Sequence, residues 1–407
     1  MPGSGSPDRY GLRVPKVHLH PDHKANVSKE PVHGVLEVLG RGSGFLRRKA
    51  SGYAPSSEDV YVHSKLINRF GLRTGDELSG IPGGKPKNGK APPLSRLDTV
   101  NGAAPDEVAR RPAFDDLPAQ HPDEQLVLEC GSMAGGRPDY TNRVVDLFCP
   151  FGKGQRAMIV APAKAGKTTV LQRVAEGVVK NHPECELFIL LVDERPEEIT
   201  DMEACGYGEV IASSFDFPAD RHISTAEVTL ERARRLVEMG KDVVLILDSI
   251  TRLARAHNTK EEGSGRTLSG GLDATALERP KRLLGSARKI REDQGGGSLT
   301  IIATALVDTG SRMDQVIFEE FKGTGNSELV LSRELADRRV FPAIDLVASA
   351  TRREELLLSE DSLQLSRALR RQFSGKSPEE AMTELLAVMK QTGSNQELIE
   401  RSKAARR

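Results

Sequence analysis

Ala161-Pro-Ala-Lys-Ala-Gly-Lys-Thr168 lies between an apolar run, Ala157-Met-Ile-Val160, and a segment with helical periodicity. In that segment Val170, Val174 and Val178 fall on one helical face. A strand, a tight loop and a helix in this order bring the backbone N–H groups of the helix N-terminus against phosphates. The usual motif opens with Gly, whereas Ala161 stands in that place.

The lysine and the hydroxyl that end this loop are the two groups that a nucleoside triphosphate requires. Lys167 can reach the β and γ phosphate oxygens, and the Thr168 hydroxyl can bind Mg²⁺. We therefore predict that the loop binds ATP, with Mg²⁺ as cofactor. The residues assigned to the nucleotide are Lys164, Ala165, Gly166, Lys167, Thr168 and Thr169.

The composition limits the class of protein. A chain of 407 residues is long enough for roughly two or three domains. With 38% hydrophobic and 29% charged residues it is expected to be soluble, and no apolar run approaches the ~18 residues of a membrane helix. Four scattered cysteines indicate neither zinc nor disulfides, so we expect a cytoplasmic protein. The formal net charge is zero, but basic residues outnumber acidic ones between His33 and Val100, which permits contact with a polyanion.

The N-terminal part of the chain changes character twice. Residues 1–32 are rich in Pro, Gly, Ser and charge and are expected to be disordered. Residues 33–102 carry short strands with glycine turns, which predict a small β-barrel with one short helix over Ser64–Phe70. Residues 103–136 are assigned as a linker, polar and extended at least as far as Gln125.

Residues 137–407 alternate strands and helices, which predicts an α/β domain with a parallel sheet. A helix is expected from Ser224 to Met239, with Ser224 and Glu227 as a capping box and Gly240 at its end. The segment from Pro378 onward has helical periodicity. The expected strands are Met158–Ala161, Leu187–Val192, Val243–Leu247, Leu299–Ala305 and Leu329–Leu331.

Acidic residues follow two of these strands. Asp248 ends the apolar run from Val243 and is the candidate metal ligand. The alternative is an aspartate that ends the strand by chance. Glu194 ends the run from Leu187 and is the candidate base that polarises the attacking water. Because two carboxylates and Arg195 emerge together there, an ion-paired rim is the structural alternative.

Several motifs together resemble the Rho family of transcription termination factors. They are the phosphate loop, Asp193-Glu-Arg-Pro-Glu-Glu198, Asp248-Ser-Ile-Thr-Arg-Leu-Ala-Arg255, Asp308-Thr-Gly-Ser-Arg312 and Phe321-Lys-Gly-Thr-Gly-Asn326. The resemblance runs from about Val35 to at least Glu355. It implies an RNA-binding barrel of the OB fold, a RecA-like ATPase domain and a homohexameric ring. Such a ring hydrolyses ATP to move along nascent RNA and dislodges RNA polymerase.

The resemblance also implies residue roles in ATP hydrolysis. Glu194 matches the catalytic glutamate and Asp248 the metal-site aspartate, with Lys167 on the phosphates. Arg352 matches an arginine finger that reaches into the adjacent subunit, so activity should depend on assembly. The other implied residues are Arg195 and Arg252, which sense the nucleotide, Phe341, which packs on adenine, and Arg156, which binds the nucleotide.

RNA contacts are implied in two places. The barrel would bind through Phe45, Arg47, Asp59 and Tyr61, although Ser43 and the lack of an aromatic near Lys90 depart from the family pattern. The alternative is that Phe45 and Tyr61 are barrel core. The two channel loops would bind through Arg266, Thr267, Ser269 and Gly270, and through Ser311 and Arg312; a plain surface loop is the alternative for the first.

Two other functions compete with an RNA translocase. One is a ring ATPase of the rotary or protein-export kind, which shares the RecA-like core. The other is an RNA-binding regulator whose nucleotide site is inactive. The channel loops and barrel aromatics disfavour the first, and the complete set of catalytic residue types disfavours the second.

Overall fold

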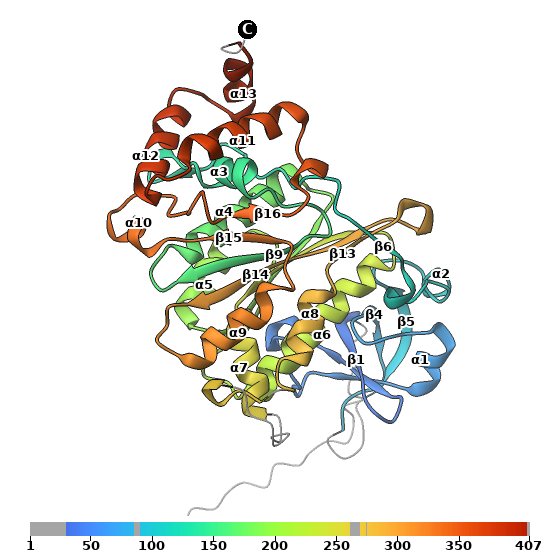
Figure 1. Cartoon of the computed structure of the whole chain (residues 1–407). Coiled ribbons are helices and arrows are strands. Elements are labelled where there is room, and N and C mark those ends of the chain that lie inside the picture. Colours follow the sequence, from blue (N-terminus) through green and yellow to red (C-terminus); the bar gives the residue numbers. More distant parts are fainter. Residues whose placement is uncertain (1–29, 85–89, 261–268, 274, 405–407) are drawn as a thin grey trace, which may run out of the picture.

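The computed structural model describes residues 30–84, 90–260, 269–273 and 275–404, and these form two lobes joined side by side (Figure 1). The expected N-terminal disorder covers residues 1–32, of which 1–29 lie outside the described residues; Val32 is described and begins the first strand, so the expectation was wrong at that residue. None of the described helices is long and apolar enough to cross a membrane.

The smaller lobe is a five-stranded antiparallel barrel in the order β3-β2-β1-β4-β5. Its core contains Leu36, Leu46, Leu78 and Val100, all at 0% exposure. The predicted helix α1 is confirmed at Ser64–Phe70, whereas β5 was not predicted because Pro and Lys interrupt the pattern just before it. The strands are β1 Val32–Val38, β2 Gly44–Arg47, β3 Val60–Val62, β4 Glu77–Pro82 and β5 Leu94–Val100.

The segment after the barrel is not an extended polar connection, and that expectation was wrong. It contains α2 Pro105–Val108, a single 3-10 turn and β6 Ala119–Gln120, which pairs with β13 Arg288–Ile290. Phe114 and Leu117 are buried against the larger lobe. A few apolar side chains at long spacing anchor this segment, and such a pattern has no detectable period.

The larger lobe is built on a mostly parallel sheet in the order β11-β10-β12-β14-β9-β15-β16. All five predicted strands are confirmed within a few residues, and β11 and β16 were not predicted. The strands are β9 Arg156–Pro162, β10 Glu186–Glu194, β11 Glu209–Ser214, β12 Asp242–Asp248, β14 Ser298–Val307, β15 Ser327–Val330 and β16 Ala350–Thr351; a separate hairpin joins β7 Met133–Ala134 to β8 Arg137–Pro138.

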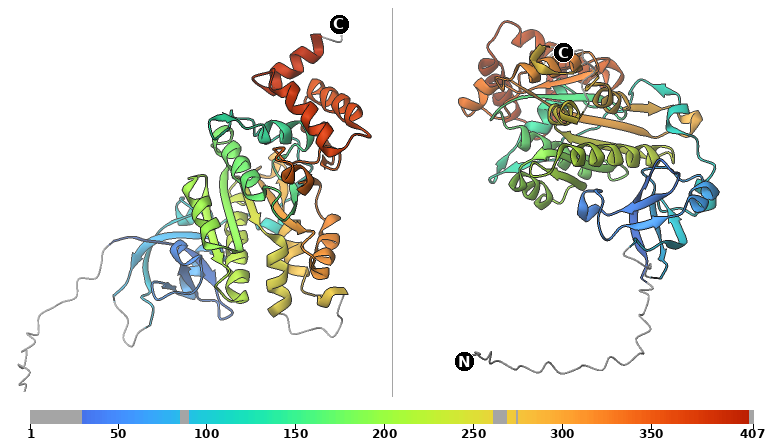
Figure 2. Two further views of the ribbon diagram at one scale, coloured as in Figure 1. Left: turned by 90° about the vertical axis from the view of Figure 1, so that its left-hand side faces the viewer. Right: turned by 90° about the horizontal axis from the view of Figure 1, so that it is seen from below.

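Helices cover both faces of this sheet. One apolar core lies beneath α3, α4 and α5 together with the C-terminal helices, and the other beneath α6 to α9 (Figure 2). The helices are α3 Thr141–Phe148, α4 Lys167–Asn181, α5 Pro196–Ala204, α6 Ala219–Val237, α7 Ile250–Lys260, α8 Glu278–Gly285, α9 Arg312–Lys322, α10 Arg333–Asp337, α11 Glu360–Phe373, α12 Pro378–Met389 and α13 Asn395–Ala404.

Helix α6 begins five residues before the predicted start. Pro218 is its N-cap, so Ser224 and Glu227 lie inside the helix and the expected capping box was wrong. A capping box does form at α12, between Ser377 and Glu380. Serine followed three residues later by glutamate can lie at the start of a helix or inside one. Only tertiary packing decides where the helix begins.

The barrel is fixed to α6 by a buried polar cluster. The Tyr53 hydroxyl donates to Glu209 at 2.8 Å and accepts from Arg232 at 2.5 Å, and Arg232 also lies 3.2 Å from Glu77. Nearby, Gly75 has φ +95°, and a Cβ there would overlap the backbone of Glu231. Close packing and shared hydrogen bonds therefore hold the two lobes together.

Replacing Tyr53 by Phe is expected to lower the free energy of unfolding by about 1–2 kcal/mol, because a buried hydroxyl and its two hydrogen bonds are removed. Arg232 and Glu209 still pair at 2.5 Å, which limits the effect. Urea denaturation measures it. Tyr61→Phe is the control, since the hydroxyl of this half-buried residue forms no hydrogen bond within the described part of the chain; equal stabilities of the two variants would contradict the prediction.

Candidate nucleotide and RNA sites

The phosphate loop joins the end of β9 to the start of α4, as the sequence predicts. Gly166 caps α4 with φ +85°, a left-handed conformation that favours glycine. A Cβ on Gly166 would lie 4.0 Å from the Phe341 ring, so this half-exposed aromatic lies beside the loop. Lys164 and Thr169 are exposed and Ala165 is buried, which leaves an open helix N-terminus.

The three central side chains of the predicted site come together at one edge of the sheet. The Lys167 ammonium on α4 lies 2.9 Å from Glu194 at the end of β10. It also lies 2.6 and 2.5 Å from the two carboxylate oxygens of Asp248 at the end of β12. Sequence reasoning missed Thr304 on β14, whose buried hydroxyl donates to Asp248 at 2.6 Å.

Burial controls the charge of this cluster. Removal from water, followed by the nearby Asp248 carboxylate, raises the pKa of Glu194 to about 7 despite the opposing effect of Lys167. Burial also disfavours the Lys167 ammonium, but the two carboxylates outweigh it and the pKa of Lys167 is raised. A carboxyl group with a pKa near neutrality can accept a proton from water more effectively than an ordinary glutamate.

The predicted arginines at this edge are placed differently. Arg252 on α7 lies 3.2 Å from Glu194 and 3.3 Å from Asp193. Arg195 is the N-cap of α5 and is exposed, so its side chain is at the same edge but not in the cluster. Sequence reasoning did not identify His222 on α6, which lies 3.9 Å from Asp193.

The residues available for a metal ion suit Mg²⁺. The described residues contain no group of three or more His, Cys, Asp or Glu side chains that could hold a metal alone. Mg²⁺ usually takes one or two protein oxygens and completes its shell with phosphate oxygens and water. The Asp248 carboxylate and the Thr168 hydroxyl at the start of α4 are such donors.

The structure does not bring Arg156 or Arg352 to the phosphate loop of their own chain. Arg156 begins β9, whereas the loop follows its end, ~20 Å along a seven-residue strand. Asn326 connects the two arginines: its carbonyl accepts from the Arg352 N–H and its side chain from the Arg156 N–H, both at 2.9 Å. Burial and then Arg352 lower the pKa of Arg156. Arg156 therefore does not lie at the phosphate loop of its own chain, and its assignment to the nucleotide stays a prediction.

The barrel residues predicted to bind RNA share its outer face. Phe45 and Tyr61 lie side by side on β2 and β3, with ring centroids 5.6 Å apart, and neither belongs to the barrel core. Arg47 and Asp59 form a buried ion pair, and Arg47 also contacts Glu37 at 2.5 Å. The pair thus orders the strands beneath the two half-buried rings.

The two predicted channel loops meet in space. Arg266 and Thr267 lie outside the described residues, but Ser269 and Gly270 pack on the start of α9. A Cβ on Gly270 would lie 2.7 Å from the Met313 nitrogen. Ser311 caps α9, and the following Arg312 is exposed.

Together these features define an α/β P-loop ATPase domain preceded by a small antiparallel barrel with two half-buried aromatics outside its core. Residues 141–351 match the nucleotide-binding domain of the ATP synthase alpha/beta family, and residues 32–106 match the Rho termination factor RNA-binding domain. The chain belongs to the Rho family of transcription termination factors. The expected RecA-like domain and OB-fold barrel are thereby confirmed.

Relatives named transcription termination factor Rho support this assignment. The protein of Gemmatimonas aurantiaca is 54% identical over 88% of this chain and 49% of its own length. The Cereibacter sphaeroides protein is 50% identical over 90% of this chain and 86% of its own length. The chain therefore spans about half the length of the first relative and most of the second.

Solved structures also share the fold. An ATPase from a type III secretion system of pathogenic bacteria matches with a TM-score of 0.58 and 23% identity, over 78% of this chain and 92% of that one. At this level of identity the likeness concerns the fold alone.

Proposed function

We propose that this chain is an ATP-driven RNA translocase that works in the cytoplasm as a homohexameric ring and terminates transcription by displacing RNA polymerase from nascent RNA. The observation that carries the proposal is the convergence of Lys167, Glu194 and Asp248 in a chain that also presents Phe45 and Tyr61 on a barrel. We place the barrel domain at 33–102, the linker at 103–136 and the ATPase domain at 137–407.

ATP hydrolysis follows from the geometry of the sheet edge. The N–H groups at the start of α4 and the Lys167 ammonium bind the phosphates, so the lysine exchanges its carboxylate partners for phosphate oxygens. Glu194 then holds the attacking water and accepts its proton. Thr168 and Asp248 would hold Mg²⁺, which when bound would supply charge neutralisation for the phosphates. Phe341, next to Gly166, packs against the adenine.

A ring is required in this proposal because two of the arginines assigned to the nucleotide, Arg352 and Arg156, are not in the cluster of their own chain. Arg352 and Arg156 lie at the opposite end of β9 from the phosphate loop of their own chain. They therefore act, in this proposal, on the nucleotide of the adjacent protomer. Arg252 and Arg195 at the catalytic edge respond to the bound nucleotide from within the same protomer.

RNA is bound first on the barrel and then in the channel. Bases stack on Phe45 and Tyr61, with Arg47 and Asp59 fixing the strands that carry them. The channel loops, with Arg266, Thr267, Ser269 and Gly270 on one and Ser311 and Arg312 on the other, contact the RNA backbone. Because Ser43 replaces one stacking aromatic, the barrel of this chain depends strongly on Phe45.

ATP hydrolysis with and without pyrimidine-rich RNA tests the function. We expect strong stimulation by RNA. Phe45→Ala is expected to weaken binding of a short oligonucleotide by roughly 5- to 150-fold, since one stacked base contributes ~1–3 kcal/mol. Arg312→Ala should instead preserve oligonucleotide binding and lose the stimulation.

Two results would contradict the proposal. If RNA does not change the rate of ATP hydrolysis by the wild type, RNA has no part in the ATPase cycle. If Phe45→Ala changes neither the stimulation by RNA nor oligonucleotide binding, the barrel face does not recognise RNA. The channel loops would then be the remaining RNA-binding candidates.

A further inference from the structure

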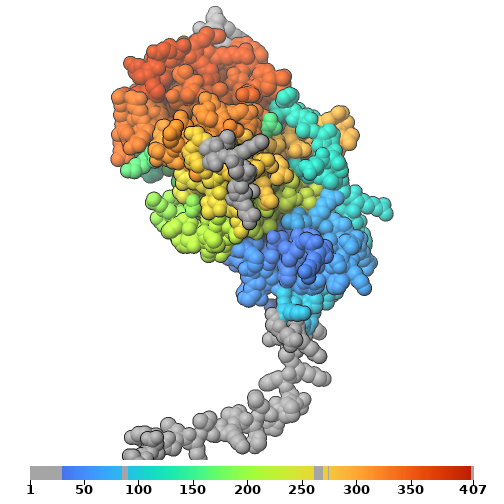
Figure 3. Space-filling model, turned by 60° about the horizontal axis from the view of Figure 1, so that its bottom comes forward, coloured from blue at the N-terminus to red at the C-terminus, as the bar shows by residue number. Residues whose placement is uncertain are grey.

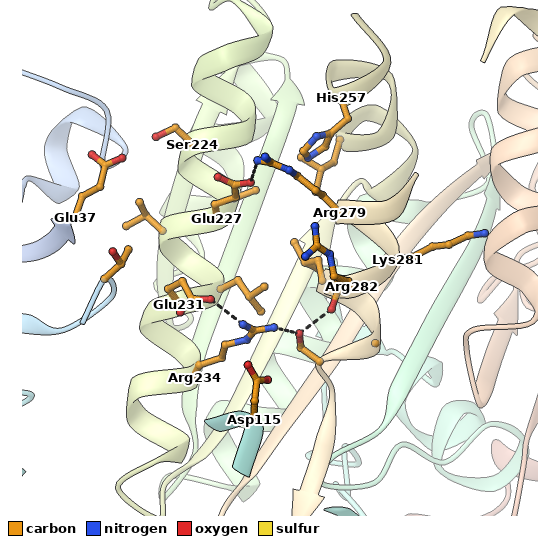
Figure 4. A pocket seen from close by; sticks show the side chains of 18 of the residues that line it. Glu37, Asp115, Ser224, Glu227, Glu231, Arg234, His257, Arg279, Lys281 and Arg282 are labelled. Carbon is orange, nitrogen blue, oxygen red and sulfur yellow. Dashed lines mark hydrogen bonds and ion pairs between the residues drawn. The ribbon is translucent and has the colours of Figure 1, made fainter. Parts of the chain in front are cut away.

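A groove of about 980 Å³ lies between the barrel and the helices α6, α7 and α8 (Figure 4). Glu37 at the edge of the barrel forms one wall, and α6 contributes Glu227 and Glu231 to its middle. The opposite wall carries Arg279 and Arg282 of α8. On the face drawn in Figure 3 the barrel adjoins the yellow-green to yellow part of the ATPase domain.

The basic wall of the groove has charge available for a ligand. Arg282 is exposed and forms no ion pair or side-chain hydrogen bond within the described part of the chain. Arg279 pairs with Glu227 at 2.6 Å, but both side chains are about half exposed, so water screens the pair and an anion can replace the carboxylate. Lys281 points away, toward Glu320 on α9.

The acidic side of the groove, on α6, is held more firmly than the basic wall on α8. Arg234 bonds Glu231 at 2.8 Å and reaches the Ser286 hydroxyl at 2.5 Å. Carboxylates on this side repel phosphates but can accept hydrogen bonds from ribose hydroxyls or base amino groups. The groove thus offers positive charge for phosphates on the α8 wall and hydrogen-bond acceptors for sugar and base edges on α6 in its middle.

The two ends of the groove lie at the two candidate RNA sites. At the barrel end Glu37 pairs with Phe45 across β1 and β2 and contacts Arg47. At the other end the groove includes Leu253 and His257 of α7, which ends at Lys260, where the chain enters the first channel loop. The groove therefore offers a path for a strand held at both sites.

We propose that the groove binds the single-stranded RNA that connects the barrel to the channel, with Arg282 and Arg279 on its phosphates. This inference rests on the proposed function and adds a third RNA-contacting surface to it. Charge complementarity and continuity with the barrel face favour RNA as the occupant over a second copy of the chain.

RNAs of two lengths test the groove with the full chain. A pyrimidine-rich oligonucleotide of about five nucleotides fills only a barrel site, and one of about sixty also spans the groove. The Arg282→Glu variant is expected to bind the short RNA with unchanged affinity and the long RNA roughly tenfold more weakly at low salt. The slope of log affinity against log salt should fall by about 0.7 for each phosphate that the variant no longer neutralises. Arg282→Ala should show a smaller change of the same kind.

Arg371→Glu is the matched control, because it reverses an exposed arginine on α11, away from the groove. Equal long-RNA affinity and salt slope for Arg282→Glu and this control would overturn the inference. If sedimentation shows that Arg282→Glu no longer forms the ring, the inference is also overturned, and the groove is assigned to contact between protomers. Wild-type protein that binds the long RNA no better than the short one would instead refute the proposed function.

Discussion

Glu194→Gln is expected to lower RNA-stimulated turnover of ATP by about 10²–10⁴-fold while ATP still binds. Glutamine has the size of glutamate, but its amide cannot accept a proton from the attacking water. Lys167 retains the Asp248 carboxylate at 2.5 Å, so the phosphate loop keeps its geometry. The measurements are steady-state hydrolysis and equilibrium binding of a fluorescent ATP analogue.

Glu198→Gln is the control for this prediction, because Glu198 is a half-buried glutamate on the adjacent helix α5. The pH dependence adds a second readout. Since the pKa of Glu194 is raised to about 7, the group must lose its proton to act as a base, and kcat/KM of the wild type should rise as the pH increases through about 7. Turnover of Glu194→Gln equal to that of the control would remove Glu194 from the base role.

The catalytic edge was predictable because its signals are local. The phosphate loop is one continuous segment, and Glu194 and Asp248 each end an apolar run. Parallel strands place their carboxyl ends at the same edge of the sheet, so these separate local signals imply a shared site. Thr304 gave no such signal, because it lies within the apolar run of β14 and contacts Asp248 only across the sheet.

Other features depend on contacts between distant segments. Arg156 stands close to the phosphate loop in the chain, yet a whole strand separates them in space. The cluster of Tyr53, Glu209 and Arg232 joins three elements that no sequence pattern relates. The α6–α8 groove likewise exists only once the barrel has docked, which is why no motif pointed to it.

The position of Arg352 leads to the prediction about ring assembly. Arg352→Ala and Lys167→Ala should each be nearly inactive alone, since an arginine finger contributes about 10³–10⁵ to kcat in phosphoryl transfer. If the arginine acts on the adjacent protomer, a mixed ring contains sites where an intact Lys167 faces an intact Arg352. With equal amounts and random assembly this holds for about a quarter of the sites.

Mixing the two inactive variants is therefore expected to restore ATP hydrolysis, which neither variant shows alone. Native mass spectrometry verifies that the rings are mixed. The reference is a mixture of Arg353→Ala with Lys167→Ala. Arg353 is the neighbouring exposed arginine and pairs only with Glu355 within the described residues. This mixture measures how much activity an intact site retains when its neighbours are inactive. If the reference rings hydrolyse ATP but mixed Arg352→Ala rings stay inactive, the finger does not act between protomers. Recovery would explain why Arg352 and Arg156 lie at the far end of β9: they complete the site of the next protomer, and hydrolysis in one subunit then depends on the position of its neighbour.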